Sequence, residues 1–261
     1  MSREIDEVKY EVAQATRILS SLGLASGVTA SLGHVSMRVP NQPDRFVVKG
    51  RGYEIDALEE MQYYDMIVCD LEGYKVDGPA KSTQCSEVKI HACILRERPD
   101  VMSVVHVHPR YTVLMTVLEE RLRPMAQEGA QLVLDELPVY PHTKTVWSEE
   151  EGSELASCLG DRKAVLMRGH GASMTGRSVS DSVLSMLQLE EQAKMNWYAY
   201  CAAGPDHASI SREQAMDFGA NMRTLGDQPH LKPEVAPTSR KPSGVWRHYS
   251  KLVSAPDYPP A

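Results

Sequence analysis

The stretch SVVHVHPRY, residues 103–111, places two histidines two positions apart at the end of an apolar run. Alternate side chains of a β-strand point to the same face, so a strand here would present the imidazoles of His106 and His108 side by side, about 7 Å apart along the backbone. Pro109 ends the strand, and pockets of mixed α/β folds open at such places. The spacing indicates metal chelation, although two histidines hydrogen-bonded within a core would also fit it.

Strands and helices are expected to alternate along the sequence on both sides of this stretch, because segments with helical periodicity follow segments rich in β-branched residues. This order predicts an α/β fold. Helices are expected over residues 4–22, 84–96 and 110–118, from about residue 148, and over 178–200; strands are expected over 26–40, 45–52, 66–78 (as a hairpin), 102–107 and within 163–176.

Composition limits the classes of function. The chain has 261 residues and a net charge of −7, which argues against a nucleic-acid surface because phosphate binding relies on clustered positive charge. No segment approaches the roughly 20 apolar residues of a membrane helix, and the charged N-terminus is unlike a secretory signal. The five cysteines are scattered and contain no CxxC pair, which favours reduced thiols. We expect a cytoplasmic protein whose partner is a small molecule.

The domain organisation is read from a change in composition near Gly226. We expect one catalytic domain over residues 1–226 and a proline-rich C-terminal arm over 227–261, in which Trp246 and Tyr249 stand out as large apolar residues. Two readings of the arm stay open: it lies on a neighbouring subunit, or it is disordered.

A catalytic metal site usually takes three protein ligands, so a third is needed. His170 is the best candidate, since it follows an apolar strand and has glycine on both sides, which allows close backbone approach. The competitors are His91, His34 and His142. Glu87 precedes His91 by four residues on an expected helix, where the two would share a face as base and orienter or only as a surface pair.

Three segments together resemble the class II aldolase/adducin family in their order and separation: QCSEVKIH (84–91), RPDVMSVVHVHP (98–109) and LMRGHGAS (166–173). The resemblance covers roughly residues 8–203. It implies a three-layer α/β/α domain around a central mixed, largely antiparallel sheet, and a homotetramer with active sites at subunit interfaces. It also implies that His106, His108 and His170 hold a divalent metal, zinc before iron, cobalt or manganese, and that Glu87 is the acid/base.

Two departures from the sugar-phosphate aldolases of this family point to a branch within it. His34 replaces an asparagine in GHVS (33–36), and in VVKGRGYE (47–54) Arg51 and Gly52 stand where those aldolases have a serine and a glycine, so a neutral phosphate cradle is absent. These changes resemble the branch that decarboxylates hydroxylated aromatic or ring-opened muconate acids, such as 3,4-dihydroxyphthalate, in bacterial aromatic catabolism. The resemblance implies a metal-dependent carboxy-lyase that acts through a metal-stabilised enolate.

Five further residues are expected to bind a carboxylic acid substrate. Lys49 and Arg51 offer fixed positive charge, and a guanidinium can bind a carboxylate through two hydrogen bonds, although both could be ordinary surface charges. His34 would contact carboxylate or phenol oxygens, Ser86 would orient the substrate or Glu87, and Tyr249, with Trp246, could cap a flat ring.

Two other functions stay open. One is a class II aldolase or dehydratase acting on a sugar or hydroxy acid, which the changed phosphate motifs permit. The other is an adducin-like scaffold domain that has lost catalysis, although the presence of all three histidines and of Glu87 argues against it.

Overall fold

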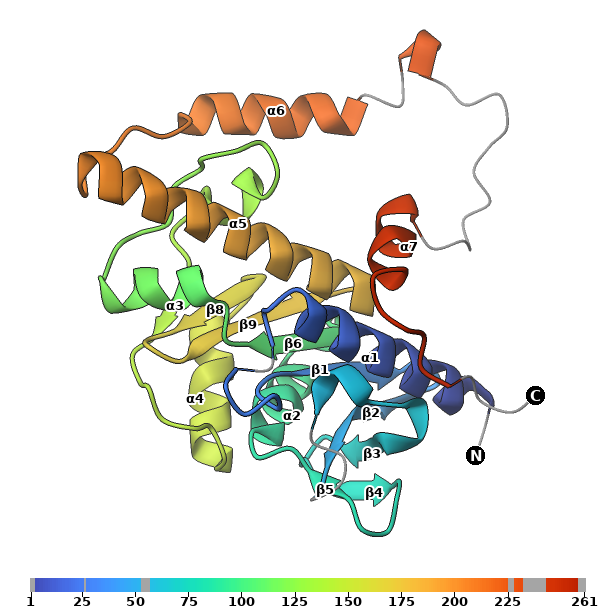
Figure 1. The fold of residues 1–261 in the computed structure, drawn as a ribbon. Coiled ribbons are helices and arrows are strands. Elements are labelled where there is room, and N and C mark those ends of the chain that lie inside the picture. Colours follow the sequence, from blue (N-terminus) through green and yellow to red (C-terminus); the bar gives the residue numbers. More distant parts are fainter. Residues whose placement is uncertain (1–2, 26, 53–56, 225–227, 232–242, 258–261) are drawn as a thin grey trace.

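The computed structural model describes residues 3–25, 27–52, 57–224, 228–231 and 243–257. Figure 1 shows how its elements are arranged. The helices are α1 (Arg3–Ser21), α2 (Val88–Glu97), α3 (Arg110–Val117), α4 (Glu149–Leu159), α5 (Val179–Ala203), α6 (Arg212–Thr224) and α7 (Gly244–Ser250). The strands are β1 (His34–Val39), β2 (Gln42–Arg51), β3 (Met66–Asp70), β4 (Lys75–Asp77), β5 (Thr83–Gln84), β6 (Ser103–Val107), β7 (Val139–Tyr140), β8 (Ala164–Met167) and β9 (Gly171–Gly176).

One sheet forms the centre of the molecule. Its strand order is β4-β3-β2-β1-β6-β9-β8-β7, with β5 paired to β2 beside this path. Every pair is antiparallel except β7 with β8, which is parallel. The prediction of a mixed, largely antiparallel sheet is therefore confirmed. Strand β6, which contains His106 and leads into His108, lies in the middle of the sheet, between β1 and β9.

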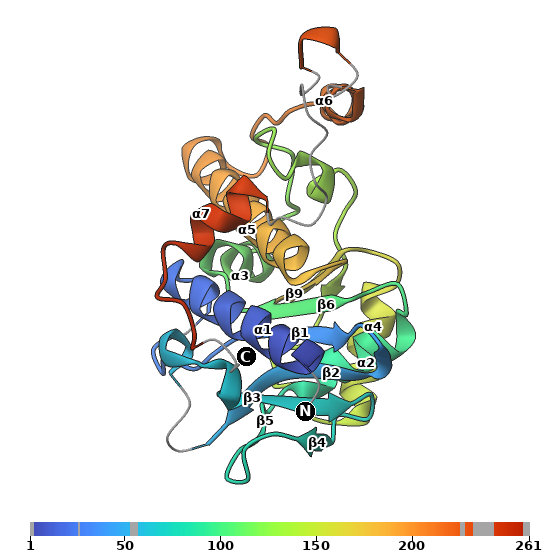
Figure 2. The same cartoon turned by 90° about the vertical axis from the view of Figure 1, so that its right-hand side faces the viewer.

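Helices cover both faces of the sheet (Figures 1 and 2). One hydrophobic cluster joins α1, α3, α5 and α7 to one face, and a second joins α2 and α4 to the other. Alternation along β6 feeds both clusters, because Val105 packs in the first and Val104 in the second. The three-layer prediction is confirmed. Within the described ranges, no helix has the length and apolar character needed to cross a bilayer.

The structure differs from the predicted elements at four places. The strand expected over residues 26–40 is shorter, because β1 covers only His34–Val39. The helix expected over 84–96 begins at Val88, because residues Thr83–Gln84 pair with β2 and Glu87 is the N-cap in a non-helical conformation (φ −107°, ψ 31°). The segment after His170 is a full strand, β9, although its glycines and hydroxyl residues give little strand signal. Helix α6 was not predicted; it packs beside the turn at residues 130–133.

The described part of the C-terminal arm packs on its own chain. Helix α7 contacts α1, and Trp246 is only 9% exposed within the first cluster, with Tyr249 packed against that cluster. The described residues of the arm are therefore ordered on the protomer, with the indole of Trp246 buried in the first cluster. The predicted boundary at residues 226–227 lies outside the described residues, as do residues 232–242.

Candidate metal centre and active site

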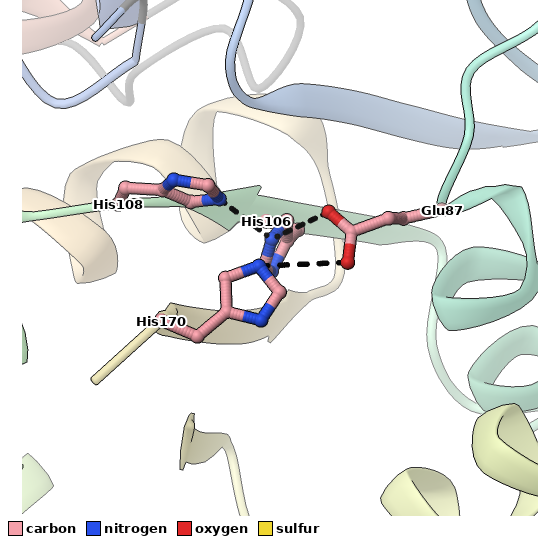
Figure 3. Close-up of side chains that lie close together, drawn as sticks. All are labelled: Glu87, His106, His108 and His170. Atoms are coloured by element: carbon pink, nitrogen blue, oxygen red, sulfur yellow. Dashed lines mark hydrogen bonds and ion pairs between the residues drawn. The ribbon is translucent and has the colours of Figure 1, made fainter. Parts of the chain in front are cut away.

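Three imidazoles converge at the end of the central strands, as Figure 3 shows. His106 is in β6, His108 follows the last residue of β6, and His170 is in the turn between β8 and β9. The Nε2 atoms of His106 and His108 are 3.2 Å apart, and the ring centroid of His170 lies 5.1 Å from that of His106 and 4.8 Å from that of His108. The antiparallel pairing of β6 with β9 brings the third histidine to the first two.

Glu87 completes this cluster from the opposite side (Figure 3). Its Oε2 lies 3.3 Å from Nε2 of His106, and its Oε1 lies 3.5 Å from Nε2 of His170. The backbone N–H of Val146 donates to Oε1 at 3.0 Å, which orients the carboxylate. Burial by itself would raise the pKa of the Glu87 carboxyl, but the imidazoles of His106, His170 and His34 together hold that pKa well below its usual range. The resting state is therefore a buried carboxylate.

The donor set fits a divalent metal. Glu87, His106, His108 and His170 can each offer one ligand atom, and these atoms all lie within 4.8 Å of one another. Zinc ligands at about 2.0–2.1 Å in a tetrahedron are about 3.3 Å apart, which matches the 3.2 Å between the Nε2 atoms of His106 and His108. The other nitrogen of His106 is used by Ser173, whose Oγ lies 3.1 Å from Nδ1. A partner on the far nitrogen is the usual way in which a ligating imidazole is oriented.

The protonation state of His108 is compatible with metal binding. Burial, followed by the neighbouring His106 and His170, lowers the pKa of His108 to about 3. His108 is therefore neutral near pH 7, and a neutral imidazole is the form that binds a metal.

His34 lies beside the cluster, paired directly with His106 across β1 and β6. Its Nε2 is 3.9 Å from Oε2 of Glu87. Burial first, then the neighbouring His91, lowers the pKa of His34 well below its usual value. Proximity to Glu87 makes His34 a neighbour of the reacting region, although it is not one of the four residues whose ligand atoms cluster.

The two remaining competitors for the third ligand lie elsewhere. His91 is fully buried on α2, where its Nε2 lies 2.6 Å from Nδ1 of His34 and its Nδ1 lies 2.7 Å from Oγ of Ser36. The expected pairing of His91 with Glu87 on one helix face does not form, because α2 begins after Glu87. His142 is exposed and its ring packs edge-on against Tyr140.

A cavity of about 100 Å³ opens beside Glu87 and His108. It brings together four of the five predicted substrate-binding residues: His34, Lys49, Arg51 and Ser86. The fifth, Tyr249, is on α7 against the first hydrophobic cluster and does not line this cavity.

Two of the lining residues carry positive charge. Lys49 is only 3% exposed and its Nζ donates to the carbonyl of Ser31 at 2.9 Å, whereas Arg51 is exposed. A buried ammonium group and a solvent-facing guanidinium at one cavity favour an anionic ligand.

Sequence reasoning missed several residues of the site. Ser36 and Ser173 support His91 and His106, and Cys85 lines the cavity. Burial raises the pKa of the Cys85 thiol to about 12, so it is a neutral lining group and not a thiolate ligand. The sequence HVS at residues 34–36 offered a signal for Ser36, because side chains two positions apart in a strand, here His34 and Ser36, lie on the same face.

Comparison with known proteins agrees with this geometry. Residues 10–197 match the family described as Class II Aldolase and Adducin N-terminal domain. The chain is 30% identical over 231 residues to a 3,4-dihydroxyphthalate decarboxylase of Rhodococcus jostii, with 85% of this chain and 93% of that protein covered. It is 27% identical over 224 residues to a 5-methylthioribulose-1-phosphate/5-deoxyribulose-1-phosphate aldolase of Rhodospirillum rubrum, covering 86% and 95% of the two chains.

The fold is also similar to a crystal structure of an aldolase II superfamily protein from Pseudomonas syringae, with a TM-score of 0.75 at 21% identity over 97% of this chain and 92% of that one. The prediction of a carbon–carbon lyase is confirmed by relatives that are named as decarboxylases. The family match covers most of the chain and includes all four residues of the cluster. The chain belongs to the class II aldolase/adducin family.

Proposed function

We propose that this chain is a metal-dependent decarboxylase of a hydroxylated aromatic or ring-opened, muconate-type carboxylic acid, with 3,4-dihydroxyphthalate as the leading substrate. The observation that carries the proposal is the position of the Glu87 carboxylate, against the three converging imidazoles and at the edge of a cavity that Lys49 and Arg51 also line. The 30% identity to the 3,4-dihydroxyphthalate decarboxylase of Rhodococcus jostii supports this substrate class.

His106, His108 and His170 would hold the divalent metal, for which we propose zinc. When bound, the metal would supply a Lewis acid that stabilises negative charge on a substrate oxygen. The protein would then provide orientation, charge complementarity and proton transfer.

Glu87 is proposed as the acid/base. As a carboxylate it accepts the proton of a substrate hydroxyl adjacent to the carboxylate that is lost, and it returns this proton to the ring carbon that bears the carboxylate. The product of this transfer is a β-keto acid. Its bond to CO2 breaks, the electron pair moves through the re-formed double bond to the oxygen, and solvent supplies the final proton.

The charged lining is proposed to position a second carboxylate of the substrate. Lys49 and Arg51 provide the countercharge, while Ser86 lies next to Glu87 and would orient either the substrate or the carboxylate. Tyr249 does not line this cavity, so it would contact a substrate ring only if α7 were placed differently. Homotetramer formation and a cytoplasmic location belong to the same proposal, and light scattering of the purified protein tests the first.

The test is a screen of ortho-hydroxy aromatic acids with the zinc-loaded protein. We expect one CO2 released per molecule of 3,4-dihydroxyphthalate consumed. Salicylate serves as a substrate with one carboxylate, and it should react less well because it lacks the second carboxylate that Lys49 and Arg51 are proposed to position. Cleavage of a sugar or hydroxy acid to an aldehyde, with no CO2 from any aromatic acid, would contradict the proposal.

That contrary result would favour the second candidate, an aldolase. The 27% identity to a sugar-phosphate aldolase over 86% of the chain supports it. A release assay for aldehyde, run on the same protein sample, separates the two reactions.

A further inference from the structure

A buried chain of three polar side chains leads from the sheet to the cavity. His34 and Ser36 are two positions apart in β1, so both face α2, where His91 fits between them. Nε2 of His91 lies 2.6 Å from Nδ1 of His34, and Nδ1 of His91 lies 2.7 Å from Oγ of Ser36. The exposed fractions are 0% for His91 and Ser36 and 5% for His34.

Each contact in this chain requires a single proton between its two atoms. Two neutral imidazoles at 2.6 Å form a hydrogen bond only if one ring donates and the other accepts. Because every neutral imidazole carries its proton on one nitrogen, the direction of one bond sets the direction of the next. Two directions of donation are therefore possible. Either Ser36 donates to His91 and His91 donates to His34, or His34 donates to His91 and His91 donates to Ser36.

The group at the cavity end selects the direction. Nε2 of His34 faces Oε2 of Glu87 at 3.9 Å, a buried carboxylate. An N–H at this nitrogen is attracted to the negative charge, whereas a lone pair is repelled, and the low dielectric of a buried site makes the difference large. The favoured order is Ser36 donating to His91, and His91 donating to His34, which leaves His34 with a proton on Nε2.

We propose that Ser36 and His91 are positioning residues that hold His34 as a neutral imidazole with its Nε2–H directed into the cavity, where it donates to a carboxylate oxygen of the substrate. The inference rests on the proposed function only for the identity of that ligand. The arrangement of the three side chains does not depend on it.

Packing leaves His91 little freedom to adopt another arrangement. Its ring stacks on Phe46 at a centroid distance of 6.4 Å and meets the ring of His34 edge-on at 4.8 Å. A side chain held on both nitrogens and stacked on one face fixes the orientation of the ring that it touches. His34 therefore enters the cavity in one tautomer and one rotamer, which lowers the entropy lost on binding an anion.

The first arm of the test measures tautomers by long-range proton–nitrogen NMR of histidine-labelled, zinc-loaded protein. We expect His34 and His91 each to carry their proton on Nε2 and to have a bare Nδ1. The reverse pattern, with the proton on Nδ1 in both rings, would overturn the inference. This arm does not require any catalytic activity.

The second arm measures binding of phthalate, with catechol as a probe that lacks a carboxylate, by calorimetry on the zinc-loaded protein. A hydrogen bond to a charged group contributes enough that His34→Phe should raise the Kd of phthalate about 10- to 100-fold. His91→Leu should raise it about tenfold and Ser36→Ala about threefold. His91→Gln, whose amide can still donate to His34, should have a Kd close to that of the wild type and below that of Ser36→Ala. The Kd of catechol should change less than threefold throughout.

The exposed His142 provides the control, because His142→Gln should leave both values unchanged. Circular dichroism and metal content verify that each variant is folded and loaded. If His34→Phe weakens phthalate binding while His91→Leu and Ser36→Ala do not, the positioning role is wrong. If the wild type shows the expected tautomers but binds no phthalate, the positioning chain stands and the proposed acid substrate falls.

Discussion

His34 is paired with His106 across the antiparallel strands β1 and β6, and the centroids of the two rings lie 5.1 Å apart. One ladder position thus brings a cavity-lining imidazole next to one that is proposed to bind the metal, although the two residues are far apart in the sequence. Nε2 of His34 also lies 3.9 Å from Oε2 of Glu87, the N-cap residue of α2. The predictions below follow from this arrangement of neighbours.

Glu87→Gln should retain the metal and lose turnover. The amide keeps the shape of the carboxylate but cannot accept and return a proton, so kcat should fall by about 10²- to 10⁴-fold. Metal content by mass spectrometry and CO2 release, measured on the same sample, check this. Loss of metal from this variant would show that Glu87 is required as a ligand.

His108→Ala should lose both metal and turnover, since it removes one of three imidazoles that converge on the site. The measurement is zinc bound per chain after dialysis. His142→Ala is the matched control, because His142 is exposed and outside the cluster, and it should bind zinc as the wild type does. Full zinc occupancy in His108→Ala would remove this residue from the ligand set.

Arg51→Ala should weaken binding of a dicarboxylate and spare a monocarboxylate. Loss of a charge-assisted hydrogen bond corresponds to about a 10- to 100-fold rise in KM for the dicarboxylate, with kcat changed much less. Arg51→Lys keeps the charge but cannot form the bidentate hydrogen bonds of a guanidinium. Its KM for the dicarboxylate should lie between those of the wild type and Arg51→Ala. Equal loss on both classes of substrate would place Arg51 away from the second carboxylate.

The metal-free protein should lose stability steeply in acid. Burial, followed by the neighbouring His106, lowers the pKa of His91 to about 3, against about 6.5 in an unfolded chain. The unfolded state therefore binds more protons between these values, so the stability is present above pH 6.5 and is lost as the pH falls toward 3. For His91 alone this amounts to about 2 kcal/mol between pH 8 and pH 5.

Urea unfolding at several pH values, with a chelator present, measures this loss. His91→Gln should be less stable at pH 8 and should show a shallower decline between pH 6.5 and pH 5. Parallel declines in the two proteins would show that His91 does not titrate on unfolding.

Glu190→Ala should destabilise the fold by about 2 kcal/mol. From α5, the carboxylate of Glu190 accepts hydrogen bonds from the backbone N–H groups of Tyr111 and Thr112, at 2.8 and 2.9 Å, and from Oγ1 of Thr112. These contacts cap the start of α3, immediately after His108 and Pro109. Glu191→Ala changes the exposed neighbour on the same helix and should alter the free energy of unfolding by less than about 0.5 kcal/mol. Equal effects of the two substitutions would contradict the capping role.

Local sequence signals were sufficient for much of the architecture. The spacing of apolar residues predicted α1 nearly to its observed ends, because amphipathic periodicity reflects one buried face. For α5 the signal was Ser178 with Asp181, residues typical of the start of a helix. The alternation before Pro109 predicted β6 and its two imidazoles for the same reason. Where the signal was local but weak, as at β9 and at the start of α2, pairing with a neighbouring strand decided the structure.

By itself the sequence determined which chemical groups this protein has, and the spacing of His106 and His108 already pointed to a metal. Only the tertiary structure decided which other side chains reach them. The pairing of β1, β6 and β9 placed His34 and Ser173 beside His106. His91, on α2, is within hydrogen-bond distance of His34 and is not one of the four residues whose ligand atoms cluster. The physical reason is that strand register is set by burial of both sheet faces, a property of all the strands together that no single stretch of sequence contains.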